Sequence, residues 1–339
     1  RHTLALHDAL PIYQMKSILE KSAYGANVTS FFKTSTEVIQ ETPPEELTEM
    51  INLGVGIVTI FGHGGTDTFD FSIDDPSSYE NENRYHVFFS LGCNNGNFHF
   101  KPGGALDRSA SEDYVLEPNK GAIAFIASSG FGVLSPLALM QSEYYRQLGA
   151  PENIGLGIGE VLRKMARQLE SPNLDPVTRA HLQQYSLHGD PAIKIIPYDA
   201  PDYVIERGSV NFSPTVIDTR QDSLSVLFNV LNLGKSIEDS LLLKIDRKLP
   251  DESVFTALEK KIAAPLYRSR LSLRLPTLGE NAIGANRLYI TLNEDESIEE
   301  KPMPTARNNN QYINALGEEG TSFYITNNSA VPVFPTPYA

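Results

Sequence analysis

The pattern of apolar positions divides the chain into two regions that predict different secondary structure. Between residues 13 and 198, short apolar runs alternate with longer segments whose apolar residues recur every three or four positions. The runs predict buried strands and the longer segments predict helices, which favours an α/β fold with a mainly parallel sheet covered by helices on both faces. The predicted strands are Val55–Phe61, His86–Leu91, Ala122–Ala127 and Ala192–Ile196, and the predicted helices are Thr36–Leu53, Pro136–Leu148, Ile158–Leu169 and Pro176–Tyr185.

From residue 199 onward, strand-like runs are separated by turn-prone residues, and no long helical segment interrupts them. This pattern predicts a small antiparallel β-sandwich over residues 199–305. Residues 306–339 contain an asparagine run and several prolines, which predict a linker or the start of a further module. The predicted strands of the sandwich are Leu224–Val230, Leu241–Ile245, Tyr267–Leu275 and Arg287–Leu292.

Residues 1–12 need a separate interpretation. Asp8–Ile12 back-translates to the end of a common sequencing-adapter oligonucleotide, and the residues before it fit the same oligonucleotide. We therefore interpret residues 1–12 as an adapter-like, non-native segment and leave them out of the fold, with a natural amphipathic segment as the alternative. On this interpretation the domain at residues 13–198 is truncated at its N-terminus, and the absence of a signal peptide carries no information on location.

Composition excludes several classes of protein. The chain has 28 Lys and Arg residues against 42 Asp and Glu residues, so its formal net charge is −14. No cluster of basic residues resembles a footprint for phosphates, which argues against a nucleic-acid partner. No apolar run approaches the roughly 18 residues of a membrane span. The single cysteine excludes an internal disulfide and a multi-cysteine zinc site.

Reactive residues follow two of the predicted strands. Val55–Phe61 leads into the turn Gly62–Gly65, which holds His63, and His86–Leu91 leads into the turn Gly92–Gly96, which holds Cys93. Ligands of a parallel sheet bind beyond the carboxyl ends of its strands, so the imidazole and the sulfur can face one another there. An imidazole that accepts the thiol proton activates the sulfur as a nucleophile, and backbone N–H groups stabilise the oxyanion that forms. The amides of Gly64 and Cys93 are the predicted donors.

Other interpretations of these residues are weaker. A single free cysteine is most often a small buried hydrophobic residue, and a lone turn histidine most often bonds to backbone. The placement of Cys93 at a strand end, opposite a glycine-flanked histidine, favours chemistry instead. A metal site would need His86 and His99 to converge with a carboxylate, and we predict no metal site.

At these two turns the sequence resembles the gingipain family of cysteine peptidases, which have a caspase-like fold. The resemblance covers roughly residues 36–198 and implies that Cys93 is the nucleophile, that His63 is the proton-transfer partner, and that the amides of Gly64 and Cys93 form the oxyanion hole. It also implies that Ser129 and Phe131 line the substrate-binding pocket and that the β-sandwich is immunoglobulin-like. Further segments that agree are Ser111–Glu112, Gly121–Ser128 and Leu187–Ala192.

The resemblance also implies a setting. Family members include secreted endopeptidases and the sortase-like transpeptidase of the type IX secretion system, so the implied location is secreted or at the bacterial outer membrane and cell surface. A polypeptide is then the substrate, and cell-envelope secretion components are potential partners. No cofactor is required, although calcium often stabilises family members. In the family, one acidic residue orients the histidine and another binds a basic side chain of the substrate, and both lie upstream. No residue here matches either of them, so specificity for Arg or Lys is not implied.

Three functions remain in competition. The first is a cysteine endopeptidase or transpeptidase that acts through an acyl-enzyme on Cys93. The second is a catalytically silent peptidase-like scaffold of a large cell-surface protein, which would be free to lose either His63 or Cys93. The third is a small-molecule acyltransferase, which would need a closed pocket in place of an open peptide groove.

Overall fold

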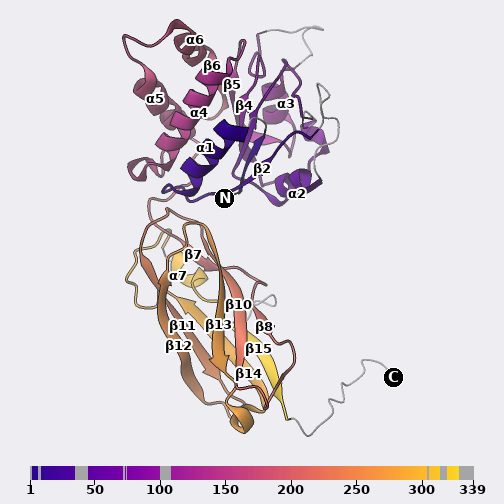
Figure 1. Cartoon of the computed structure of the whole chain (residues 1–339), viewed down its shortest axis with the longest axis vertical. Coiled ribbons are helices and arrows are strands. Elements are labelled where there is room, and N and C mark those ends of the chain that lie inside the picture. The colour runs from indigo at the N-terminus through magenta and orange to yellow at the C-terminus, as the bar shows by residue number, and fades with distance from the viewer. Residues whose placement is uncertain are drawn as a thin grey trace, which may run out of the picture. The chain divides into compact units, whose positions relative to one another are not determined.

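The computed structural model describes residues 2–6, 9–34, 45–71, 73, 75–99, 108–303, 305–313 and 319–327. The chain forms two compact units, Arg1–Pro197 and Tyr198–Ala339 (Figure 1). The first unit combines helices with one sheet, and the second consists mainly of strands. Each unit is described by itself.

Unit 1 is built on a six-stranded sheet in the order β2-β1-β3-β4-β5-β6. Neighbouring strands are parallel except for β6, which runs antiparallel to β5. The predicted mainly parallel α/β sheet is therefore confirmed. Its strands are β1 His2–Leu6, β2 Asn27–Phe31, β3 Ile57–Phe61, β4 His86–Leu91, β5 Ala122–Ser128 and β6 Tyr185–Gly189.

Helices cover both faces of this sheet, which explains why its central strands are buried at nearly every position. Side chains of β3 alternate between the faces: Ile57 and Phe61 pack in one core cluster, and Val58 and Ile60 pack in the other. Helices α1, α4 and α5 contribute buried residues to the first cluster, and α2 and α3 contribute to the second. The helices are α1 Ala9–Glu20, α2 Glu45–Leu53, α3 Ala110–Leu116, α4 Leu134–Gly149, α5 Ile158–Leu169 and α6 Pro176–Gln184.

The last strand of unit 1 differs from the prediction. Residues 192–196 are not a strand, and the strand at this point is β6, which precedes them. Gly189 has a φ of 129°, a conformation open to glycine, and Pro191 follows it without an N–H to donate. The chain therefore leaves the sheet at Gly189, and Ile193 instead accepts the N–H of Ile158 through its carbonyl at 2.8 Å.

The N-terminal residues also differ from the expectation that they stand outside the fold. β1 lies inside the sheet, paired with β2 on one side and with β3 on the other. Ile12 in α1 is fully buried in the core. The adapter-like origin of residues 1–12 stays a prediction, but the structure uses them as part of unit 1. The predicted start of a helix at Thr36 lies outside the described residues. Within the described residues, α2 begins at Glu45.

Unit 2 contains two sheets that share one apolar core. One sheet has the order β13-β10-β7, with β8 also paired to β10, and the other has the order β12-β11-β14-β15-β9. In β10 and β11 every second residue is buried, as expected for strands with one face on a core. A short helix, α7 Thr305–Asn309, belongs to the same unit. The strands are β7 Tyr203–Ile205, β8 Asn211–Ser213, β9 Ile217–Asp218, β10 Ser223–Asn232, β11 Ser240–Lys248, β12 Val254–Ala263, β13 Arg268–Pro276, β14 Gly284–Leu292 and β15 Thr321–Thr326.

A fully buried arginine joins the two sheets of unit 2. Arg247 of β11 donates to the Asn286 side chain of β14 at 2.9 and 3.1 Å, and to the carbonyls of Pro276 and Thr277 at 2.6 and 3.1 Å. Pro276 ends β13 of the opposite sheet. Burial lowers the pKa of this guanidinium to about 10. The carbonyl and amide oxygens replace water around the charge, so Arg247 ties the core together as a polar bridge.

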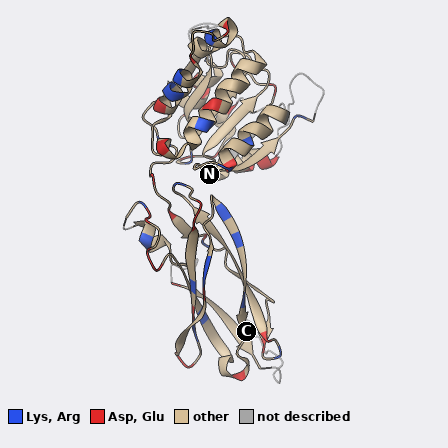
Figure 2. Cartoon of the chain, turned by 60° about the vertical axis from the view of Figure 1, so that its left-hand side comes forward, with Lys and Arg blue, Asp and Glu red and all other residues tan. Residues whose placement is uncertain are grey.

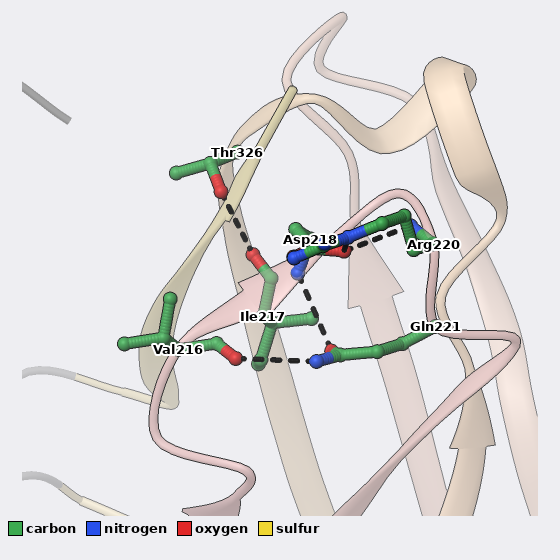
Figure 3. A network of polar contacts seen from close by, with 6 residues as sticks. All are labelled: Val216, Ile217, Asp218, Arg220, Gln221 and Thr326. Carbon is green, nitrogen blue, oxygen red and sulfur yellow. Dashed lines mark hydrogen bonds and ion pairs between the residues drawn. The ribbon is translucent and has the colours of Figure 1, made fainter. Parts of the chain in front are cut away.

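The C-terminal strand of unit 2 was expected to lie beyond the sandwich, yet β15 pairs with β14 and with the two-residue strand β9. Side chains hold β9 in place (Figure 3): the Thr326 hydroxyl donates to the carbonyl of Ile217 at 3.3 Å, and Arg220 binds the Asp218 carboxylate with its Nε 3.1 Å from both oxygens. Gln221 completes the network by accepting the N–H of Asp218 at 3.3 Å. These contacts compensate for the short backbone pairing.

Charged residues are mixed in sign in both units. In the view of Figure 2, Lys and Arg positions are dispersed among Asp and Glu positions on the helices of unit 1 and along the strands of unit 2. Within the described part of the chain, no helix has the length and apolar character required to cross a membrane.

A buried histidine at the start of β4 lies at the end of the strand remote from Cys93. His86 is fully buried, its ring is 5.8 Å from that of Phe88 and 6.2 Å from that of Tyr114, and neither ring nitrogen has a hydrogen-bond partner among the described residues. Burial lowers the pKa of His86 to about 3 from its ordinary value of 6.5. A proton on this ring is therefore strongly disfavoured in the folded chain.

We expect His86 to weaken the fold in acid. Between about pH 6.5 and pH 3 the unfolded chain binds a proton at this position that the folded chain does not, so the free energy of unfolding falls by up to about 1.4 kcal/mol for each pH unit of acidification. Denaturant unfolding of His86→Phe at several pH values should show a shallower decline than the unsubstituted chain. His99→Phe, at an exposed position, is the control, and an unchanged slope in His86→Phe would contradict the prediction.

Candidate active site

The carboxyl ends of β3 and β4 bring His63 and Cys93 to one pocket. The pocket has a volume of about 160 Å³, and both residues line it. His63 is exposed, and Cys93 is partly buried. The predicted convergence of the two turns at one edge of the sheet is therefore found. The lining residues are Gly62, His63, Leu91, Gly92, Cys93, Gly132, Leu134 and Leu137.

The turn after β3 is a tight hairpin that fixes the backbone of His63. The N–H of Asp70 donates to the His63 carbonyl at 3.2 Å, and the N–H of His63 donates to the Asp70 carboxylate at 3.3 Å. Asp70 is buried, and a Cβ on Gly62 would lie 2.8 Å from one of its carboxylate oxygens. Glycine is therefore required at position 62 for the chain to pass over this carboxylate.

The turn after β4 presents the cysteine. Asn94 has a φ of 59°, a left-handed conformation that asparagine tolerates better than most residues. The N–H of Asn94 donates to the carbonyl of Gly130 at 2.8 Å, and the N–H of Gly96 donates to that of Ser128 at 3.0 Å. The cysteine turn is thus anchored on the carboxyl end of β5, and Cys93 is positioned by backbone contacts.

A buried amide holds the two turns together. The side chain of Asn95 accepts a hydrogen bond from the Ser90 hydroxyl at 2.6 Å and donates to the carbonyls of Gly65 and Thr68 at 2.6 and 3.0 Å. Its exposed fraction is zero, so each of these polar groups depends on its partner inside the protein. Asn95 therefore couples the histidine hairpin to the cysteine turn.

The first turn of α3 makes a second connection between these loops. The N–H of Ala110 donates to the carbonyl of Thr66 at 2.7 Å, and the N–H of Ser111 donates to the backbone carbonyl of Asn95 at 3.1 Å. The first N–H groups of a helix have no partner within it, so they are free to bind other carbonyls. Ser109 and Glu112 form the capping box that starts this helix.

The Cys93 sulfur receives a backbone hydrogen bond from a third segment. The N–H of Gly132 points at Sγ with a distance of 3.2 Å, and Sγ lies 3.8 Å from the Gly132 carbonyl. The sulfur is therefore held against the Gly132 peptide by a backbone hydrogen bond. Gly132 belongs to the segment after β5, in which sequence reasoning singled out Ser129 and Phe131 but not Gly132, because its role arises from a contact between residues 39 positions apart.

The amides of Gly64 and Cys93 have the freedom expected of oxyanion donors. No described residue accepts a hydrogen bond from either N–H. A Cβ on Gly92 would lie 3.3 Å from the Gly64 nitrogen and 3.2 Å from its Cα, so the Gly64 amide lies directly against the peptide that leads into Cys93. The Gly64 amide therefore lies close to the segment that leads into Cys93, and neither N–H is engaged by a described acceptor.

The two residues predicted to line a substrate pocket lie next to it. The Ser129 hydroxyl donates to the carbonyl of Gln184 at 3.1 Å, and neither Ser129 nor Phe131 is among the lining residues. The Phe131 side chain is exposed, and its carbonyl accepts from the Gln184 amide at 2.8 Å. Leu134 and Leu137 line the pocket instead, so the segment is the expected one but the residues that face the cysteine differ.

A second histidine contacts the cysteine turn from β6. The ring of His188 hydrogen-bonds to the backbone of Gly96, and its Nε2 lies 3.0 Å from the Ser186 hydroxyl. Its ring packs edge-on against Phe98 at 5.2 Å. Burial lowers the pKa of His188, so the neutral ring that packs here is favoured near pH 7. Among the described residues, no three His, Cys, Asp or Glu side chains come together in a way that could hold a metal ion.

A thiol and an imidazole thus lie at adjacent strand ends of an α/β sheet. This arrangement is typical of proteins that use a thiol as a nucleophile. Residues 5–196 match the model of peptidase family C25. The chain therefore belongs to peptidase family C25, the gingipain family of cysteine peptidases. No match was found among curated proteins.

Solved structures of gingipains are similar to this chain. The Arg-specific cysteine proteinase gingipain R (RgpB) is 14% identical with a TM-score of 0.47, and the match covers 96% of this chain and 67% of that one. The complex of the pro- and mature domains of Porphyromonas gingivalis RgpB is 12% identical with a TM-score of 0.47, covering 96% and 68%. The Saccharomyces cerevisiae separase–securin complex is 13% identical with a TM-score of 0.37, covering 56% and 11%. Family membership rests on the family model.

We expect Asn95→Ala to separate the two turns. The substitution leaves the carbonyls of Gly65 and Thr68 and the Ser90 hydroxyl without their partner, at about 1–3 kcal/mol for each buried group that stays unpaired. Thermal unfolding should show a loss of several kcal/mol in stability, and alkylation of Cys93 should slow. Asn97→Ala, which removes the same side chain from the same turn, is the matched control. Equal stability of the two variants would contradict the coupling.

Proposed function

We propose that this chain is a peptidase whose nucleophile is Cys93 and whose proton-transfer partner is His63. The observation that carries the proposal is that both side chains line one pocket while the Gly132 N–H donates to Sγ. The N–H holds the sulfur in place, and the exposed imidazole is accessible to a leaving group that needs a proton. Membership in a family of cysteine peptidases supports a polypeptide as the substrate.

The proposed reaction proceeds in two transfers that share one intermediate. The Cys93 thiolate attacks the carbonyl carbon of the substrate, and the new S–C bond converts the carbonyl oxygen to an oxyanion. When the C–N bond breaks, protonated His63 donates its proton to the leaving amine, and a thioester remains on Cys93. Water then attacks the thioester, His63 accepts the proton of that water, and the S–C bond breaks to release a carboxylic acid and the thiolate.

The oxyanion is proposed to bind the N–H groups of Gly64 and Cys93. Their lack of partners among the described residues supports this role, because a donor already engaged in the protein would contribute little to a developing charge. The close approach of Gly92 to Gly64 keeps both donors in one place before the substrate arrives. Preorganisation of this kind lowers the barrier without a reorganisation cost.

Hydrolysis and transpeptidation differ only in the second nucleophile. An amine in place of water would give the sortase-like reaction of the type IX secretion system, and the thioester on Cys93 serves both. The expected setting is the exterior or the outer surface of a bacterial cell, with secretion components as partners. We propose that unit 2 is the immunoglobulin-like module of such a protein, on the support of its two sheets around one core.

The proposed chemistry requires no cofactor, since the thiol, the imidazole and the two amides supply each step. A structural calcium ion stays a prediction. No step of the proposed reaction depends on such an ion. The silent scaffold stays the alternative, and the experiment below separates it from the enzyme.

Alkylation of Cys93 against pH tests the proposal, because the chain has one cysteine and the reaction reports on it alone. We expect alkylation to be fast at pH 7, because an imidazole that accepts the thiol proton activates the sulfur. His63→Ala should slow the reaction at pH 7 about ten-fold. Peptide cleavage should be lost in Cys93→Ala and greatly reduced in His63→Ala.

His99→Ala is the matched control, because His99 is an exposed histidine at the end of the same cysteine turn region. It should leave both the alkylation rate and the cleavage rate unchanged. A profile that is the same in the unsubstituted chain and in His63→Ala would make Cys93 an ordinary thiol, and the scaffold interpretation would then replace the enzyme.

A further inference from the structure

The pocket beside Cys93 has apolar walls. Leu91, at the end of β4, and Leu137, in α4, are both buried, and Leu134 closes the opposite side. Glycines make up most of the remaining wall. Among the described lining residues, the only ionisable groups are the imidazole of His63 and the thiol of Cys93. Asp70 lies beneath the histidine hairpin and does not line the pocket.

The size of the pocket suits one side chain. Its volume of about 160 Å³ is close to that of a cavity of about 150 Å³ which, lined by aliphatic and aromatic residues, takes up benzene. An aliphatic or aromatic side chain of a peptide is of this size. Because Sγ forms part of the wall, the side chain that enters belongs to the residue whose carbonyl the sulfur attacks.

The rim of the pocket carries an exposed apolar patch. Phe131, Val133 and Leu134 are 80%, 47% and 54% exposed, and all three lie within four residues of one another. Single exposed apolar side chains are ordinary, but a group of them beside a reactive thiol is typical of a binding surface. The patch continues the apolar wall outward, so a peptide would meet apolar surface before it reaches Sγ.

The rim is held in a fixed conformation by side chains of α6. The N–H of Val133 donates to Nε2 of His181 at 2.8 Å, and the other ring nitrogen of His181 lies 2.7 Å from the Val177 carbonyl. The Gln184 amide donates to the carbonyl of Phe131 at 2.8 Å. His181 is buried, so these contacts are shielded from water. The apolar rim is therefore built in advance and does not depend on a substrate to form it.

We propose that this pocket binds an apolar side chain of the size of Leu, Met or Phe and excludes Arg and Lys. The inference rests on the proposed peptidase function and names its substrate class. A guanidinium or ammonium group that entered the pocket would lose its hydration, and no carboxylate among the described lining residues would replace it. The net charge of −14 attracts cationic peptides at long range, but this attraction is screened by salt and does not act on one side chain.

Peptide substrates that differ only in the residue before the cleaved bond test the inference. With Leu, Phe, Arg and Lys at that position, kcat/KM should be about ten-fold or more higher for Leu and Phe than for Arg and Lys. The same four peptides as acyloxymethyl ketones should label Cys93 in the same order, since the sulfur then forms a thioether and a carboxylate leaves. Equal or faster cleavage or labelling with the basic peptides would overturn the inference and leave the proposed peptidase intact. No labelling by any of the four would overturn both.

A charge placed in the wall provides the second test. Leu134→Asp adds a carboxylate at the pocket, so the ratio of kcat/KM for Leu over Arg should fall about ten-fold or more. Leu139→Asp is the matched control, because Leu139 is exposed on the same helix, at 42%, and does not line the pocket. It adds the same charge nearby and should leave the ratio unchanged. A similar ratio in both variants would contradict the assignment of the pocket, and melting curves of the two variants verify that each is folded.

Discussion

The buried side chain of Asn95 is the interaction on which the geometry of the site depends. It lies between two turns that come from different strands, and it satisfies groups of both, so neither turn can shift without leaving a buried polar group unpaired. The first turn of α3 reinforces this with one N–H for each turn. The positions of His63 and Cys93 are thus set mainly by backbone and amide hydrogen bonds, which hold without substrate.

Three consecutive strand ends, rather than two, build the site. β3 supplies the imidazole, β4 supplies the sulfur, and the segment after β5 supplies the N–H that faces the sulfur and the leucines that face the pocket. The segment after β5 is itself bound by α6 through His181. Positioning of the nucleophile and selection of the substrate side chain are therefore linked through one short stretch of chain, in which Gly132 and Leu134 are only two residues apart.

The central sheet could be predicted because β3, β4 and β5 are buried on both faces and read as continuous apolar runs. The turns with His63 and Cys93 followed from the same pattern. The prediction of a strand at residues 192–196 was wrong, because Ile193 and Ile195 contribute to the core from a loop. The apolar pattern did not predict β12, whose residues are mostly exposed and show no clear alternation. The contact between Gly132 and Cys93 could not be predicted, since it joins distant residues through a backbone atom that every residue type carries.

The packing around Asn95 has a consequence for sequence variation at the site. A Cβ at position 64 and a Cβ at position 92 would both collide with the same atom, Oδ1 of Asn95. Once the amide has been displaced to accommodate an alanine at one position, the second alanine meets a space already vacated. The two glycines therefore form a coupled pair, in which the double substitution costs less than the sum of the two single substitutions.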